Sequence, residues 1–246
     1  MATRRGSTSE RSRPPGVALC ALSAQGRSRR SHLARLAAGA VAWSAGLLRP
    51  AAAAGYADTI ATMQTAQRRE TAVYRRYREY GQQAKAQGYT GIAYLFIALA
   101  ASELIHAQNF QRVLARLGAE AEPAPAMNPT ADGTKENLLK AVSEEIDSID
   151  AFYPGLLARL KPEGHPDALA YVTYAWESEK QHRDVIRKLQ QYSPTFFELV
   201  ARTIDMKTGT YYVCQICGST VHRIPAGRCP ICRYTSEHYR IVEPPA

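Results

Sequence analysis

Beyond residue 54 the chain lacks a marked excess of charge of either sign, although its net charge is +9. Residues 1–54 contain nine Arg, no Lys and a single acid, Glu10, whereas the remaining residues contain 22 basic and 21 acidic side chains. Proteins that bind nucleic acid or anionic membranes carry a basic face. The sequence therefore excludes nucleic acid as an expected partner of the folded part.

The N-terminal segment also lacks an apolar run long enough to cross a membrane. Its most apolar stretch, Leu33–Leu48, has 16 residues and is interrupted by Arg35, whereas a spanning helix needs about 20 apolar residues. We expect no membrane span in the mature chain.

With 46% hydrophobic residues, the 246-residue chain can bury the core of one large domain or of two smaller ones.

Residues 1–54 have the order of parts expected of an export signal. They are rich in Arg and Ser, continue with SRRSHL at residues 28–33 and an apolar stretch at Leu36–Leu48, and end in small residues at Ala51–Ala54. The paired arginines resemble a twin-arginine signal, although His32 stands where Phe is usual. We expect cleavage near the end of this segment and export to a bacterial periplasm. The alternatives are a plastid presequence for the thylakoid lumen and a disordered, partly mis-assigned N-terminus.

Residues 55–192 contain four runs with the periodicity of amphipathic helices. Gly88 separates the first two runs, a Pro- and Ala-rich stretch follows the second, and KPEGHP at 161–166 separates the third from the fourth. The runs cover residues 57–87, 90–117, 134–160 and 167–192. Short, long and short connections between long helices are typical of a four-helix bundle with a crossover. The expected fold class is therefore an all-α four-helix bundle.

The second run carries a glutamate and a histidine on its apolar face. The apolar neighbours of Glu103 and His106 at helical spacings are Phe96, Leu99, Phe110 and Val113. Both polar side chains should thus point inward, and a buried carboxylate is costly unless it is paired or bound to metal. The fourth run repeats the E-x-x-H pattern at Glu179 and His182.

The other two runs each add one inward glutamate. Glu70 and Glu145 lie on apolar faces, and each precedes the glutamate of the next run, by 33 and 34 residues respectively. A single E-x-x-H pattern on a solvated helix face would carry little information, but four inward glutamates at matching offsets favour a metal site. Carboxylates bridge and bind iron, and imidazole binds its ferrous and ferric states. Two E-x-x-H pairs and two further glutamates therefore predict a dinuclear carboxylate site.

On these residues the chain resembles the ferritin-like superfamily, and specifically the rubrerythrins. The resemblance covers about residues 57–192 and includes AQGYTGIAYLF before the first E-x-x-H and FYP after the third-run glutamate. It implies six diiron ligands: Glu70, Glu103, His106, Glu145, Glu179 and His182. It also places Tyr77 and Tyr153 near the ligand carboxylates, where each has the alternative of being an ordinary core aromatic.

Ser148 departs from the rubrerythrin pattern. Typical members carry a second glutamate there, three residues after the first, which exchanges with a histidine as the iron changes oxidation state. The remaining set of four Glu and two His is similar to a bacterioferritin ferroxidase centre, so the usual ligand exchange is in question. A register using Glu144 and Asp147 would restore an acidic pair, but it moves the glutamate off the apolar face.

Residues 209–246 form a second expected domain, joined to the bundle by a linker at 193–208. It carries two C-x-x-C pairs eleven residues apart, a spacing that places four thiolates around one tetrahedral ion. The four cysteines are Cys214, Cys217, Cys229 and Cys232. Two disulfides are the alternative in an exported chain. Tyr212, Gly218 and Pro230 resemble the residues that rubredoxins have at these places around the cysteines, whereas Arg233 stands where rubredoxins commonly have Gly. The resemblance favours iron in this site, and zinc is the alternative, because tetrahedral thiolate suits both metals.

These features lead to one expected function and two alternatives. The resemblance implies an exported non-haem diiron peroxidase that reduces hydrogen peroxide to water in oxidative-stress defence. A rubredoxin-type iron would pass it electrons from an unidentified donor. It also implies a homodimer in which the rubredoxin-like domain of one chain faces the bundle of the other. The alternatives are a ferroxidase that handles iron, which Ser148 favours, and a non-catalytic metal-binding electron carrier.

Overall fold

The computed structural model describes residues 55–123, 132–190 and 209–245. The expected export signal at 1–54 and the expected linker at 193–208 lie outside these residues. The described residues form a helical bundle and a small C-terminal domain with short strands.

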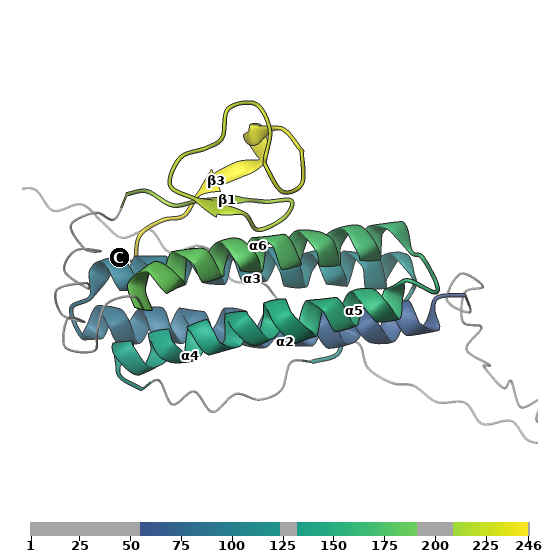
Figure 1. Cartoon of the computed structure of the whole chain (residues 1–246), viewed down its shortest axis with the longest axis horizontal. Helices are drawn as coiled ribbons and strands as arrows, with labels where there is room; N and C mark the ends of the chain where they lie inside the picture. The colour runs from purple at the N-terminus through teal and green to yellow at the C-terminus, as the bar shows by residue number, and fades with distance from the viewer. Residues whose placement is uncertain (1–54, 124–131, 191–208, 246) are drawn as a thin grey trace, which may run out of the picture. The chain divides into compact units, whose positions relative to one another are not determined.

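The bundle consists of long helices packed side by side (Figure 1). These are α2 (Ala57–Ala86), α3 (Thr90–Arg116), α4 (Thr134–Asp147), α5 (Tyr153–Leu160) and α6 (Pro166–Gln190). α2 packs along α3, and α6 packs against α3, α4 and α5. The expected all-α four-helix bundle is confirmed, with α4 and α5 together forming its third member.

A single π-helical turn at Ser148–Phe152 joins α4 to α5. The residues on either side, Asp147 and Tyr153, keep right-handed helical backbone angles, so the chain continues as one helix through the turn. The indole N–H of Trp176 on α6 donates to the carbonyl of Ile149 at 2.9 Å, which satisfies a carbonyl of the widened turn. Such turns occur mostly within α-helices at functional sites.

The turn between α2 and α3 depends on Gly88. Its backbone adopts φ +85°, a left-handed conformation that glycine reaches without steric cost. Its N–H donates to the carbonyl of Lys85 at 2.9 Å, and the next N–H, of Tyr89, donates to the carbonyl of Ala84. The helix therefore ends where the sequence predicts, and α3 begins two residues later.

Apolar side chains fill the bundle in two clusters. One contains Tyr77, Phe96 and Leu99, and the other contains Met63 and Phe110. On α2 the buried Glu70 falls between Met63 of one cluster and Tyr77 of the other, and on α3 Glu103 falls between Leu99 and Phe110. The inward carboxylates thus form a polar layer between two apolar halves of the core.

α3 is the only described helix that is long and apolar enough to cross a membrane. Within its most apolar window, 78% of the residues are buried inside the protein. Packing in the bundle core therefore accounts for its apolar composition.

The C-terminal domain is built around a small antiparallel sheet. β1 (Tyr212–Cys214) lies between β2 (Thr220–Val221) and β3 (Tyr239–Ile241), with Val213 paired to Thr220 on one side and to Arg240 on the other. A 3-10 turn at Ser236–His238 precedes β3. The four cysteines form the centre of the domain core, together with Tyr239. The expected rubredoxin-like domain is confirmed.

Candidate metal centres

The bundle brings all six candidate ligands together in its buried polar layer. They form two groups, in each of which the ligating atoms lie within 4.8 Å of one another. The first group contains Glu70, Glu103, His106 and Glu179, and the second contains Glu103, Glu145, Glu179 and His182. Glu103 and Glu179 belong to both groups, so they are in the position of carboxylates that bridge two metal ions.

Several atoms of this cluster lack a partner among the described residues, which fits a metal site. Nδ1 of His182 and Oε1 of Glu103 lie 3.4 Å apart, yet neither forms a hydrogen bond, and Oε2 of Glu145 is also unpaired. Buried polar atoms are normally satisfied, because each unpaired one is costly. Carboxylate oxygens and imidazole nitrogens are the donors that iron prefers. The chemistry of the cluster therefore fits two iron ions.

Two buried tyrosines hold the carboxylates from outside the cluster. The hydroxyl of Tyr77 donates to Oε1 of Glu145 at 2.7 Å, and that of Tyr153 donates to Oε1 of Glu70 at 3.0 Å. The Tyr153 hydroxyl also lies 3.4 Å from Oε1 of Glu179. Both tyrosines thus contact candidate ligand carboxylates, as the resemblance implies, and each orients one of them.

Burial and mutual repulsion raise the pKa values of two carboxylates of the cluster, Glu70 and Glu145. Burial, and then the nearby Glu103, raise the pKa of Glu70 to about 8. Burial and Glu179 raise the pKa of Glu145 well above its usual range. Burial alone would lower the pKa of His182, but Glu103 and Glu179 raise it to about 9. Without a metal cation, the cluster therefore keeps protons on groups that metal binding must displace.

Protein freed of iron should become less stable as the pH rises from about 4.5 to about 9. Glu70 and His182 have raised pKa values in the folded state, so the folded chain binds more protons than the unfolded chain over this window. The free energy of unfolding then falls with pH, by roughly 2 kcal/mol or more. Urea unfolding at the two ends of the window measures the change, and Glu70→Gln should reduce it. A midpoint that rises with pH would contradict the prediction.

Ser148 is held by an arginine that no sequence pattern singled out. Nη2 of Arg69 donates to Oγ of Ser148 at 2.6 Å, and that hydroxyl donates to the carbonyl of Glu144 at 2.7 Å. The guanidinium lies 4.1 Å from the centre of the Phe152 ring, and its Nη1 is 3.6 Å from Oε1 of Glu70. A cation therefore lies next to the position at which typical rubrerythrins carry another carboxylate.

The alternative register with Glu144 and Asp147 does not place these residues in the cluster. Glu144 is half-buried and forms an ion pair with Arg76, and Asp147 is exposed. Glu145, in contrast, is buried among the other candidate ligands. The third helix therefore contributes Glu145 to the cluster, in the register that follows its apolar face.

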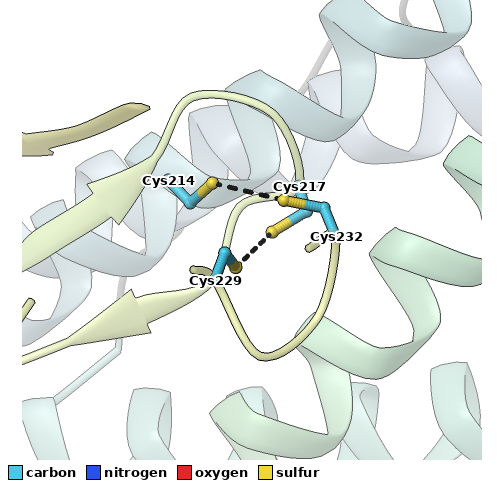
Figure 2. A group of neighbouring side chains, drawn as sticks. All are labelled: Cys214, Cys217, Cys229 and Cys232. Atoms are coloured by element: carbon cyan, nitrogen blue, oxygen red, sulfur yellow. Dashed lines mark hydrogen bonds between the residues drawn. The ribbon is translucent and has the colours of Figure 1, made fainter. Parts of the chain in front are cut away.

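The four cysteines point their sulfur atoms toward one another (Figure 2). Sγ of Cys214 lies 3.8 Å from Sγ of Cys232, and Sγ of Cys217 lies 3.6 Å from Sγ of Cys229. A disulfide requires about 2.05 Å, and all four cysteines are free, so the two-disulfide alternative is wrong. Metal–sulfur bonds of about 2.3 Å in a tetrahedron separate the sulfurs by about 3.8 Å. The cluster fits one tetrahedral ion.

The first C-x-x-C pair contacts the bundle directly. Three polar residues of α3 each meet one of three successive backbone carbonyls: Nδ2 of Asn109 donates to Ile216 at 2.8 Å, Nε2 of His106 lies 3.1 Å from the oxygen of Cys217, and Oγ of Ser102 donates to Gly218 at 2.7 Å. Since a carbonyl only accepts, Nε2 of His106 carries the proton. Nδ1 lies 3.0 Å from Oε2 of Glu103 and faces the cluster, as a metal-binding nitrogen would. One imidazole therefore joins the two metal centres.

Sequence reasoning did not identify Ser102, Asn109 or Arg69. On α3, Ser102 precedes His106 by four residues and Asn109 follows it by three, and these helical spacings would have been a signal for a polar stripe. Their partners lie more than 100 residues away in the sequence, so the sequence did not show which segment the stripe contacts. Arg69 precedes a candidate ligand directly but gives no pattern of its own.

Comparisons with known proteins agree with this geometry. The family model described as Rubrerythrin matches residues 62–190. The chain is 27% identical over 171 residues to Rubrerythrin-2 of Clostridium acetobutylicum, covering 70% of this chain and 89% of that protein. It is 28% identical over 175 residues to nigerythrin of Nitratidesulfovibrio vulgaris, covering 71% and 82% of the two chains.

Solved structures show the same likeness. The fully reduced, all-ferrous state of nigerythrin superposes with a TM-score of 0.62 and 26% identity, over 74% of this chain and 86% of that one. A bacterioferritin of Desulfovibrio desulfuricans shares the fold, with a TM-score of 0.57, 18% identity and coverage of 63% and 91%. The chain has a carboxylate and histidine diiron site in its bundle and a four-cysteine site of rubredoxin type in its C-terminal domain. It belongs to the rubrerythrin family.

Proposed function

We propose that the protein reduces hydrogen peroxide to water at the diiron site, with electrons from iron held by the four cysteines. The observation that carries this proposal is the contact between Nε2 of His106 and the carbonyl oxygen of Cys217, at 3.1 Å. His106 is a candidate diiron ligand and Cys217 is a candidate ligand of the other iron. The contact supports electron transfer between the two centres, because it connects a candidate ligand of one centre to a candidate ligand of the other.

The residues around the diiron site suit a two-electron reduction. When bound, the two irons would supply two electrons, and iron held by the four cysteines would replace these electrons one at a time. With two protons, one hydrogen peroxide would then become two waters. The hydroxyl groups of Tyr77 and Tyr153 lie beside Glu145 and Glu70 and hold protons there, because burial raises the pKa of both phenols well above its usual range. The apolar clusters on either side exclude water from the site.

The experiment compares two oxidants on anaerobically reduced, iron-loaded protein. One equivalent of peroxide should restore the absorbance of the oxidised diiron site faster than dioxygen does. Metal analysis of the same sample should find about three irons per chain, since the described residues offer two bundle positions and one four-cysteine position. If dioxygen reacts as fast as peroxide, the peroxidase proposal fails, and two irons with one zinc would remove the electron path.

A ferroxidase that handles iron is the second candidate. It is favoured by the symmetry of the two ligand groups, each of three Glu and one His, and by Arg69 at Ser148 in place of a further carboxylate. Ferrous iron added in excess to the aerobic protein would then be oxidised over many turnovers. Retention of more iron than the sites can hold would support storage rather than peroxide reduction.

The homodimer stays a proposal. In the described chain, Ser102, His106 and Asn109 contact the C-terminal domain of the same polypeptide. The two metal centres therefore meet without a second chain. The same contacts would serve an exchanged dimer, in which each domain faces the bundle of its partner, and the mass of the protein in solution tests whether a dimer forms.

A further inference from the structure

The two C-x-x-C pairs of the C-terminal domain have different surroundings. The carbonyls of the first pair, at residues 216–218, are used by α3. The second pair, Cys229 and Cys232, is buried, but the residues on both sides of it are exposed. One side of the metal site therefore contacts the bundle, and residues flanking the other side reach solvent.

Arginines surround the second pair on this exposed side. Arg228 directly precedes Cys229, Arg233 directly follows Cys232, and Arg223 lies in the loop that leads to them; all three are exposed. Nη1 of Arg228 donates to the carbonyl of Arg233 at 2.8 Å, which holds the two residues together. None of the ion pairs found among the described residues includes these arginines, so their charges are free to meet an external anion.

Arg233 keeps an unfavourable backbone conformation at this place. Its φ is +64°, and it is the only residue other than glycine with a positive φ in the described part of the chain. A side chain with a Cβ is disfavoured in this region, and glycine is the usual solution. A long cation at a position that suits glycine points to a use for the cation.

Two exposed apolar side chains complete the same face. Tyr234 is 50% exposed and Ile224 is 38% exposed. The loop that carries Ile224 lies against the segment after Arg233, because Ser236 donates from its N–H to the carbonyl of Gly227 at 3.1 Å and from Oγ to the carbonyl of Pro225 at 2.6 Å. We define the second-knuckle face as Arg223, Ile224, Arg228, Arg233 and Tyr234.

We propose that the second-knuckle face binds the acidic surface of a one-electron donor protein, which reduces the four-cysteine iron through Cys229 and Cys232. This inference rests on the proposed function. In the step, the donor loses one electron and ferric iron becomes ferrous, with no bond made or broken. Arginine and tyrosine are the residues enriched at protein interfaces, and a basic face attracts an acidic partner over a distance. The electron would enter beside the second pair and leave through Cys217 and His106.

The test uses full-length, iron-loaded protein and a reduced plant-type [2Fe–2S] ferredoxin as the acidic probe. Stopped-flow absorbance of the four-cysteine iron gives the rate constant of its reduction, and calorimetry gives the affinity of the complex. The rate constant should fall about tenfold or more between about 20 and 300 mM salt. Arg233→Glu should lower it about tenfold at low salt, whereas Lys161→Glu, an equal charge change at an exposed turn, should not.

A second variant separates docking from structure. Arg233→Gly removes the cation and relieves the backbone, so the melting temperature of the C-terminal domain should rise while ferredoxin affinity and reduction rate fall. If Arg233→Gly and Arg233→Glu both keep the parent rate, or if Lys161→Glu loses as much, the proposal is overturned. If the arginines serve only to neutralise the thiolates, the rate with a neutral reduced flavin will change as much as the rate with ferredoxin, which also overturns it. A failed peroxide reaction with normal ferredoxin docking would instead refute the proposed function alone.

Discussion

Replacing Gly218 by alanine should slow electron transfer from the four-cysteine iron to the diiron site by about 10–100-fold. Gly218 has φ +84°, and a Cβ there would lie 2.5 Å from Oγ of Ser102 and closer still to Nε2 of His106. Neither neighbour can move away freely, because both are buried and His106 is a candidate ligand. The first C-x-x-C pair must therefore lift from α3, and the contact between His106 and Cys217 is lost.

Gly227→Ala is the matched control for this change. Gly227 has nearly the same backbone angle, φ +80°, in the same domain, but nothing lies within 4 Å of the position of its added Cβ. Both variants thus carry the same backbone strain, and only Gly218→Ala disturbs the contact. The measurement mixes protein reduced at the four-cysteine iron with peroxide and follows the reoxidation of that iron. Equal slowing in the two variants would show that strain, and not the approach to α3, controls the rate.

Replacing Glu179 by glutamine should abolish iron binding at both positions of the bundle. Glu179 belongs to both ligand groups, whereas Glu70 belongs only to the first and Glu145 only to the second. Glutamine keeps the size of the side chain but removes the charge, and both candidate histidines lie 3.3–3.4 Å from this carboxylate. We expect the affinity for each iron to fall by at least about 100-fold, more than the loss of an outer partner causes.

Two further variants make this prediction specific. Glu145→Gln should remove about one of the two bundle irons, because it changes a single group. Glu144→Gln should retain both, because Glu144 pairs with Arg76 outside the cluster. Iron content by elemental analysis, with the four-cysteine site counted by its own absorbance, distinguishes the cases. Loss of iron in Glu144→Gln but not in Glu145→Gln would restore the register with Glu144 and Asp147.

Much of the bundle site could be predicted because its information is local. Glu103 and His106, like Glu179 and His182, are three residues apart on one helix, so the helical repeat alone directs both side chains inward. The two C-x-x-C pairs are equally local. Apolar periodicity also identified the helices that bring the glutamate and histidine ligands together. The π turn at Ser148–Phe152 could not be predicted, since it breaks the periodicity on which the helix prediction rests.

The long-range contacts could not be predicted, because nothing in the nearby sequence specifies a partner. Ser148 signalled a missing carboxylate, but its partner Arg69 lies 79 residues earlier on another helix. The cation beside Ser148 therefore became visible only when α2 and the third helix were packed together.

The residue types and spacings along the chain were enough to identify a helical bundle with inward carboxylates and a four-thiolate domain, because helix geometry and tetrahedral ligation act over a few residues. Only the tertiary structure decided how the two centres meet. His106 reaches Cys217 across 111 residues because α3 presents a polar stripe and Gly218 has no side chain to hold the domains apart. The metal ligands can thus be identified from local sequence, whereas the contact between the two metal centres depends on tertiary packing.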